Sequence, residues 1–485
     1  MIGVEKKTLL DERTLVDEEH RRVDAARLRG AGAGAALAVA ALGVFVVTLD
    51  ALVVNVALPS FGHDLGGSIT GLQWVIDGYT LMFAALLLSA GALADRIGAR
   101  RAFGVGLVTF VVASAACGLA PGIGALVAAR LVQGAGAAVM MPATLALIRE
   151  TYHDGARRAR AIALWSLGAS AASAAGPVVG GFLILLSWRA IFFINLPVGV
   201  VALVLFARVP RSPRRAVPFD WPGQATAVLG MGTLTYGLIE GGADSFTAPR
   251  VMVALAVAVV ALTAFLVVEA RGAHPMLPLE LFRSRPVTVS VVGGFTFTVG
   301  FYGLVFLYSL YLQQLRGLSP LATGLTFVPM TALTAVVTLL APRIAARFGP
   351  RVPIAAGQAL IAAGLLSLCV AAAEGVPIWL LATLSILVGF GGALAVPTIT
   401  ALLLGSVPAE RAGTASGTLT MFRQVGGALA VAVFGALVAH RETFLQGLEV
   451  SLVIAALLLL VTAMASLSLK VHHVSVTAQT LYDHM

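Results

Sequence analysis

The sequence predicts an all-α membrane protein of fourteen transmembrane helices, arranged as two six-helix bundles with two further helices inserted between them. Of its 485 residues, 59% are hydrophobic and only 11% are charged, whereas a soluble domain carries about 25% charged residues. The apolar residues form blocks of about twenty, the length of a helix that crosses a bilayer. The basic residues alternate between successive loops. These three observations exclude a water-soluble enzyme.

The apolar blocks lack the alternating pattern of a membrane β-barrel, so we expect helices, in which every backbone group is satisfied within its own segment. In chain order the fourteen expected spans are 33–59, 72–92, 102–120, 122–148, 161–185, 189–207, 222–240, 250–269, 286–310, 321–341, 352–373, 377–402, 412–437 and 447–469.

The charge of the loops predicts the topology. The N-terminal tail and every second loop hold 26 of the 32 basic residues, whereas the opposite loops hold only four. Cytoplasmic loops of membrane proteins are enriched in lysine and arginine. We therefore expect a multi-pass protein of the cytoplasmic membrane with both termini in the cytoplasm. The net charge of +9 is thus explained by topology and does not indicate a nucleic-acid partner.

A degenerate repeat predicts the domain organisation. Arg96-Ile-Gly98 after the second span matches Arg347-Phe-Gly349 after the tenth, so two spans separate the six-span halves. Paired repeats of this kind build transporters whose site lies between the halves. The expected domains are a cytoplasmic tail (1–32), an N-terminal six-helix bundle (33–207), a linker with two inserted helices (208–285), a C-terminal six-helix bundle (286–469) and a cytoplasmic tail (470–485).

The residues give no sign of an enzyme, a cofactor or a metal site. The sequence lacks a GxxxxGK[ST] phosphate loop, a histidine-rich box and a metal-ligand cluster. Both cysteines fall in apolar blocks, which excludes a disulfide framework. We therefore expect transport energised by the proton gradient. A membrane-embedded enzyme and a sensor with a transporter fold are the alternatives from other classes.

Transport of this kind needs a group that exchanges protons inside the membrane, and only carboxylates qualify. No lysine or histidine falls within a span, and Asp50 and Asp77 are the only acids well inside one. The helical rise places Asp50, Arg130 and Asp77 about 14, 12 and 8 Å below the outer surface. We expect Arg130 to pair with Asp50 or Asp77, and protonation to break the pair. The alternative is a static salt bridge that only orients two helices.

Six motifs occur in a characteristic order. They are Leu49-Asp50-x3-Val54-Asn55-Val56-Ala57-Leu58-Pro59, Gly91–Arg101, Leu126-x3-Arg130-x2-Gln133-Gly134-x-Gly136-Ala137-Ala138, Gly176-Pro177-x2-Gly180-Gly181, Trp188-Arg189 with Asn195-x-Pro197-x-Gly199, and Phe219-Asp220-Trp221-x-Gly223. With these motifs the chain resembles the major facilitator superfamily, and within it the fourteen-span drug:proton antiporters. Ala99, Ala172 and Leu52 depart from the family's patterns.

The resemblance implies roles for three groups of residues. Asp50 and Arg130 would couple protons. Asp77 is a further candidate from its place within a span alone, although it could also simply reach the outer surface. Gly176, Pro177 and Gly180 would bend a helix between the halves and control proton leak, although small residues also allow ordinary close packing. A third set would form a conformational gate on the cytoplasmic side, or alternatively a positive-inside anchor. This set is Gly91, Asp95, Arg96, Gly98 and Arg100.

The expected function is proton-coupled export of small amphipathic molecules, such as drugs or antibiotics, by alternating access. The alternative is a dedicated exporter of one endogenous metabolite with the same mechanism. The partners are the transported molecule, protons and the lipid bilayer, and we expect a monomer. Residues assigned to a substrate cavity are Arg423, Gln133, Trp165 and Tyr302. The alternatives are a structural Arg423 satisfied by backbone groups and aromatic side chains that face lipid or the membrane interface.

Overall fold

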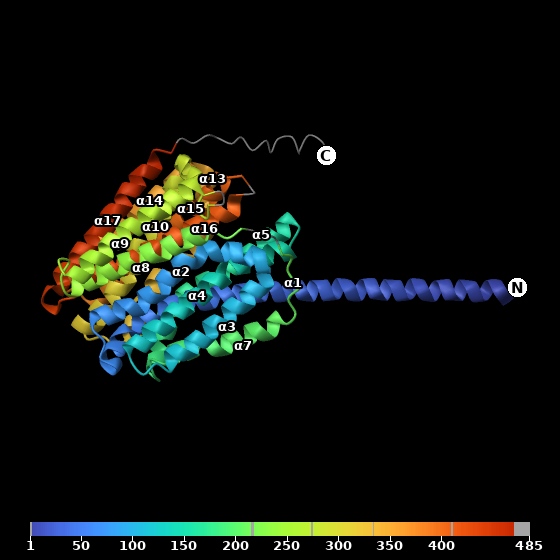
Figure 1. The fold of residues 1–485 in the computed structure, drawn as a ribbon, viewed down its shortest axis with the longest axis horizontal. Helices are drawn as coiled ribbons and strands as arrows, with labels where there is room; N and C mark the ends of the chain where they lie inside the picture. The colour runs from blue at the N-terminus through green and yellow to red at the C-terminus, as the bar shows by residue number, and fades with distance from the viewer. Residues whose placement is uncertain (1, 215–217, 273–274, 333, 409–410, 470–485) are drawn as a thin grey trace.

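The structure is a computed structural model that describes residues 2–214, 218–272, 275–332, 334–408 and 411–469. Within these ranges all regular secondary structure is helical, and the long helices run roughly side by side (Figure 1). The expected C-terminal tail, 470–485, lies outside the described residues.

The first group of helices runs from α1 to α7. Its bounds are α1 Ile2–Leu65, α2 Ile69–Ile97, α3 Ala99–Gly118, α4 Ile123–Thr151, α5 Gly155–Ile184, α6 Ala190–Phe193 and α7 Asn195–Phe206. Side chains at two starts satisfy free backbone donors, since Ser68 accepts a hydrogen bond from Gly71 and Asp154 one from Arg157. The N-terminal part of α1 projects beyond the bundle as a single long helix (Figure 1).

The inserted hairpin packs against both groups of helices. It consists of α8 (Trp221–Ala243) and α9 (Pro249–Arg271), with Asp220 capping α8 through the backbone N–H of Gly223. Helix α8 contacts α2 of the first group and α16 of the second. The inserted helices therefore lie along the seam between the halves.

The second group begins after the short helix η1 (Leu279–Arg283). Its bounds are α10 Arg285–Leu310, η2 Tyr311–Leu315, α11 Pro320–Thr326, α12 Val328–Ala332, α13 Thr334–Phe348, α14 Arg351–Ala373, α15 Ile378–Gly405, α16 Ala412–Leu437, η4 Arg441–Thr443 and α17 Phe444–Leu467. The largest cluster of buried apolar side chains draws residues from both groups, so one core extends across the seam.

Eleven helices of the described chain are long and apolar enough to cross a membrane. The other three expected spans are also helical. Segment 189–207 forms a short apolar stretch, Ala190–Phe206, and α8 is 23 residues long but rich in glycine and threonine. Segment 321–341 is interrupted at Phe327, because Pro329 has no N–H to continue the helix. A multi-pass membrane protein is thus shown, whereas the count of fourteen stays a prediction.

The two halves of the degenerate repeat have the same backbone geometry. Gly98 links α2 to α3 with φ +91°, and Gly349 links α13 to α14 with φ +78°. Only glycine adopts such a φ without strain. The arginine-rich segments 93–101, 149–160 and 208–214 lie together at one end of the helices, where Ser212 bonds both the Arg100 backbone and Glu150, and we call this end the arginine-rich face. The other end is the opposite face.

Candidate functional site

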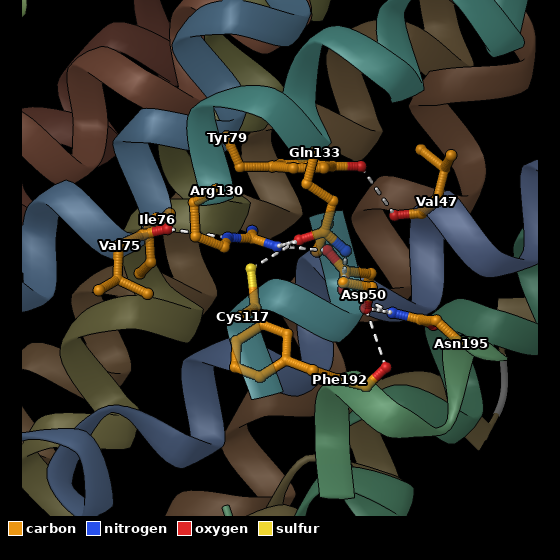
Figure 2. Close-up of polar contacts among 12 residues, drawn as sticks. Val47, Asp50, Val75, Ile76, Tyr79, Cys117, Arg130, Gln133, Phe192 and Asn195 are labelled. Atoms are coloured by element: carbon orange, nitrogen blue, oxygen red, sulfur yellow. Dashed lines mark hydrogen bonds and ion pairs between the residues drawn. The ribbon is translucent and has the colours of Figure 1, made fainter. Parts of the chain in front are cut away.

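The centre of the candidate site is a buried ion pair between α1 and α4. Nη1 of Arg130 donates to Oδ2 of Asp50 at 2.5 Å (Figure 2). Each residue is only 1% exposed. Of the two carboxylates expected as partners of Arg130, the structure therefore pairs it with Asp50. Both members of the pair are withdrawn from solvent.

Two side-chain amides complete the hydrogen bonding of the carboxylate. Gln133, one turn from Arg130 on α4, donates to Oδ1 of Asp50 at 2.9 Å. Asn195, the first residue of α7, donates to the same oxygen at 2.8 Å and to Oγ of Ser114 at 2.9 Å. Three donors thus hold one carboxylate. Hydrogen bonds of this kind fix the orientation of the carboxylate.

The guanidinium of Arg130 is held on several sides. Its Nε donates to the carbonyl oxygen of Val75 at 3.0 Å, and its Nη1 donates to Oε1 of Gln133 at 2.8 Å. The guanidinium carbon lies 4.2 Å from the ring centroid of Tyr79, a cation–π distance. The Tyr79 hydroxyl in turn donates to the carbonyl of Val47 on α1 (Figure 2).

Small residues on α4 allow this close assembly. A Cβ on Gly134 would overlap the carbonyl oxygen of Tyr79, and one on Gly136 would lie 2.7 Å from the backbone nitrogen of Phe110. The glycines of the span 4 motif therefore bring α4 against α2 and α3. This packing places Arg130 between α1 and α2, within reach of both Asp50 and the Val75 carbonyl.

Asp77 is fully buried but lies outside this network. Its Oδ1 accepts a 3.4 Å hydrogen bond from Thr80, and its Oδ2 has no partner among the described residues. One turn earlier on α2, Gln73 donates to the carbonyls of Val431 and Ala432 on α16. Residues four apart lie on the same helix face, so Asp77 faces the seam between the halves.

The span 5 motif lies between α1 and the second half. Gly176 and Gly180 face α1, where Cβ atoms would lie 2.9 Å from Cβ of Leu52 and 3.1 Å from the Val53 carbonyl. On the other side, the Pro177 carbonyl is so close to Gly324 of α11 that a Cβ there would overlap it. The motif therefore joins the helix that carries Asp50 to the other half.

The expected gate residues lie on the arginine-rich face. Gly98 makes the turn between α2 and α3, and the Arg100 backbone N–H donates to Oγ of Ser212 in the linker at 2.9 Å. Asp95 and Arg96 are exposed. A Cβ on Gly91 would meet open space.

The residues expected to line a substrate cavity have different surroundings, although Arg423 and Tyr302 interact electrostatically with each other. Gln133 belongs to the ion-pair network. Trp165 donates to Thr144 on α4 at 3.1 Å. The Arg423 guanidinium lies 5.6 Å from the Phe297 ring centroid, and no described carboxylate forms a salt bridge with it. Tyr302 packs beside Gly427, four residues along α16 from Arg423.

Sequence reasoning missed three members of the site. Asn195 was noted within a motif but not as a partner of Asp50, although a lone amide at the start of a span is a usable signal. The Tyr79 ring and the Val75 carbonyl were not expected at all, because their contacts depend on how α2 and α4 pack. No group of three or more His, Cys, Asp or Glu side chains suited to a metal ion occurs among the described residues.

Comparisons with known proteins give a family and several relatives of this chain. The model of a family described as Major Facilitator Superfamily matches residues 40–431. The chain is 38% identical over 403 residues to Multidrug resistance protein Stp of Mycobacterium tuberculosis, covering 82% of this chain and 74% of that protein. It is 35% identical over 431 residues to the Methylenomycin A resistance protein of Streptomyces coelicolor, covering 88% and 90%.

A third relative is the Tetracenomycin C resistance and export protein of Streptomyces glaucescens, 37% identical over 428 residues, with 86% of this chain and 78% of that protein covered. Among solved structures, a POT family transporter in complex with 5-aminolevulinic acid superposes with a TM-score of 0.67 at 13% identity, covering 90% of this chain and 95% of that one. At this identity the superposition shows a shared fold.

Proposed function

Because this chain belongs to the Major Facilitator Superfamily, whose members carry small molecules across membranes, we propose that it exports small amphipathic molecules, such as drugs or antibiotics, in exchange for protons. The relatives named for drug and antibiotic resistance support this substrate class. The protein would act as a monomer in the cytoplasmic membrane, with both termini in the cytoplasm and the proton gradient as its energy source.

The observation that carries the proposal is the Asp50–Arg130 pair. Both groups are buried, and three donors hold the carboxylate. Protonation of Asp50 would remove the negative charge while Arg130 stayed charged. A lone arginine at this depth costs about 2.5–3.5 kcal/mol or more. That cost would favour a rearrangement in which Arg130 regains solvent or another partner, and proton release would reverse it.

Helix α1 connects the Asp50–Arg130 pair to contacts that join the two halves near the opposite face. One turn beyond Asp50, Val53 packs against Gly180 of α5. Another turn on, the Val56 carbonyl accepts a 2.9 Å hydrogen bond from Gln313 of the second half. A shift of α1 on protonation would therefore loosen the contacts of both α5 and Gln313, and so open the opposite face.

The remaining residues fit the opening and the closing of the arginine-rich face in this transport cycle. In the opposite-face half of α5, Gly176, Pro177 and Gly180 are buried and Phe182 is exposed, whereas side chains on most sides of its other half are exposed, including Ile162, Leu164 and Leu167. This contrast supports a state that opens toward the arginine-rich face. Exposed Asp95 would cap the end of a neighbouring helix of the second half when that face closes, with Arg96, Gly91, Gly98 and Arg100 shaping the turn.

Asp77, with its unpartnered oxygen at the seam, would be a second proton-exchanging group. Arg423, Tyr302 and Trp165 would contact the transported molecule from three helices. Gln133 would take part in proton exchange at Asp50 and not in binding the transported molecule, because its amide contacts Asp50 and Arg130.

The test is Asp50→Asn in a host lacking its own efflux pumps. A susceptibility panel first identifies a compound to which the wild type confers resistance. Asp50→Asn should lose that resistance and, in everted vesicles, release no protons when the compound is added. Asp64→Asn, on the same helix but beside exposed His63, is the matched control and should behave as the wild type. A proton-coupled Asp50→Asn protein would overturn the proposal.

A second candidate is a dedicated exporter of one metabolite made by the same cell. Two relatives are named for single antibiotics, methylenomycin A and tetracenomycin C. The same panel separates the two candidates, since a dedicated exporter protects against one chemical scaffold and a general pump against several.

A further inference from the structure

A basic cavity of about 450 Å³ opens on the arginine-rich face, away from the ion pair. Its walls come from the turn between α2 and α3 and from the linker that leads into the inserted helices. Of the seven described residues that line it, four are arginines: Arg100, Arg101, Arg211 and Arg214. Four guanidinium groups around one cavity repel each other unless an anion occupies the space between them.

The cavity is built by specific contacts between its two walls. Ser212 of the linker accepts a hydrogen bond from the Arg100 backbone N–H at 2.9 Å and donates to the Glu150 carboxylate at 2.5 Å. Gly98 lies against Ser212, and a Cβ there would lie 3.2 Å from its Cβ. The linker is thus held against the turn, and the cavity between them has a defined shape.

The surroundings of the Arg100 guanidinium favour an anionic ligand. Its guanidinium carbon lies 5.0 Å from the ring centroid of Phe206, at the end of α7. Its Nε is buried and has no hydrogen-bond partner among the described residues. An arginine N–H that is withheld from water and unpaired is costly, and an anionic oxygen is its strongest acceptor.

The surroundings identify where such an anion comes from. Helices α3 and α7 pack side by side and end at the cavity. Val105, Val108 and Val112 of α3 are exposed, as are Val200, Val201 and Val204 of α7. Exposed valines on two neighbouring spans make a surface for acyl chains. A lipid lying along this surface would bring its headgroup to the four arginines.

We propose that this cavity binds the phosphate of an anionic phospholipid, with the acyl chains along α3 and α7. Basic pockets at the cytoplasmic ends of spans are suited to such headgroups. The bound lipid would neutralise the four guanidiniums and fasten the linker to the turn between α2 and α3. This site is independent of the transported molecule and of the proton pathway.

Binding is measured with the purified full-length protein in detergent, using phosphatidylglycerol with a fluorescent acyl chain and anisotropy as the readout. The test variant is Arg211→Gln/Arg214→Gln, because both side chains are exposed loop residues of the cavity wall. The control is Arg157→Gln/Arg158→Gln, which removes the same charge from exposed positions of the same face. Size-exclusion profiles establish that all proteins are folded.

At about 1 kcal/mol per arginine, the test variant should bind phosphatidylglycerol about twenty- to thirty-fold more weakly than the wild type. The control should change affinity less than three-fold, and unlabelled phosphatidylcholine should compete poorly. Equal losses in both variants would mean that general surface charge attracts the lipid, and would overturn the site. Unchanged binding by the test variant would do the same. Displacement by inorganic phosphate as effective as by phosphatidylglycerol would overturn the assignment to a lipid.

Discussion

Gly180 of α5 lies against the backbone of Val53, one helical turn beyond Asp50 on α1. A Cβ on Gly180 would lie 3.1 Å from the Val53 carbonyl oxygen and 3.3 Å from its Cα. Contacts this tight leave no room for a side chain unless α1 and α5 separate. The spacing between the two helices is therefore set by the absence of a side chain at residue 180, and the position of Asp50 depends on that spacing.

Replacing Gly180 with valine should separate the helices and disturb the ion pair. Overpacking of this kind costs about 1–3 kcal/mol, so we expect a lower melting temperature and loss of most export, measured as resistance in a pump-deficient host. Gly232→Val on α8 is the control, because a Cβ there meets open space. If Gly180→Val exports as well as the control, the α1–α5 contact plays no part in transport.

The guanidinium of Arg130 should be irreplaceable by another cation. Its Nε and Nη1 donate in different directions, to Val75 and to Asp50. A lysine keeps the charge but has no planar fork to reach both acceptors. We expect Arg130→Lys to lose at least about ten-fold in transport rate, equivalent to one lost charge-assisted hydrogen bond.

Initial uptake of the exported compound into everted vesicles measures this loss. Arg157→Lys, at an exposed position, is the matched control and should retain wild-type rates. A fully active Arg130→Lys protein would show that charge alone is sufficient at this position.

The sequence narrowed the partner of Arg130 to Asp50 or Asp77, and the structure selects Asp50. Depths calculated from the helical rise placed Asp50 and Arg130 at nearly the same level, and the structure pairs them. The carbonyl of Val75 and the ring of Tyr79 could not be predicted, because any residue has a carbonyl and aromatic rings usually pack as core. Their positions depend on the approach of Gly134 to α2.

The sequence likewise predicted some features of the fold and not others. Apolar blocks and loop charges identified the helices, but hydropathy carries no information about local breaks such as that at Phe327. The packing of the inserted helices against α2 and α16 was also beyond sequence reasoning, since both faces of α8 carry small residues without a clear apolar stripe.

Asn195 should matter through its contact with Asp50. Asn195→Ala removes one of three donors to the carboxylate and a partner of Ser114, at a cost of about 1–3 kcal/mol. We expect reduced export and an altered pH profile of transport. Asn55→Ala is the control, because buried Asn55 donates to the Ala51 carbonyl of its own helix and to no other group among the described residues. An Asn195→Ala profile identical to that of Asn55→Ala would remove Asn195 from the proton site.

Two glutamines should hold the opposite face closed. Gln73 donates to the carbonyls of Val431 and Ala432 at 3.2 and 3.1 Å, and Gln313 donates to Val56 at 2.9 Å. Each bond joins one half to the other. With about 0.5–1.5 kcal/mol for each hydrogen bond, Gln73→Ala/Gln313→Ala should shift the equilibrium roughly ten-fold or more toward an open face.

Spin labels at His63→Cys and His440→Cys, one exposed position on each half, report this opening as a longer distance in pulsed electron–electron resonance. Cys369, which is partly exposed, is replaced by serine in all proteins. Gln224→Ala is the matched control, because it also removes a buried amide-to-carbonyl bond, to Ala85, but one between α8 and α2. The double variant should gain a population at longer distance that the control lacks. Identical distributions would mean that packing, and not these bonds, keeps the face closed.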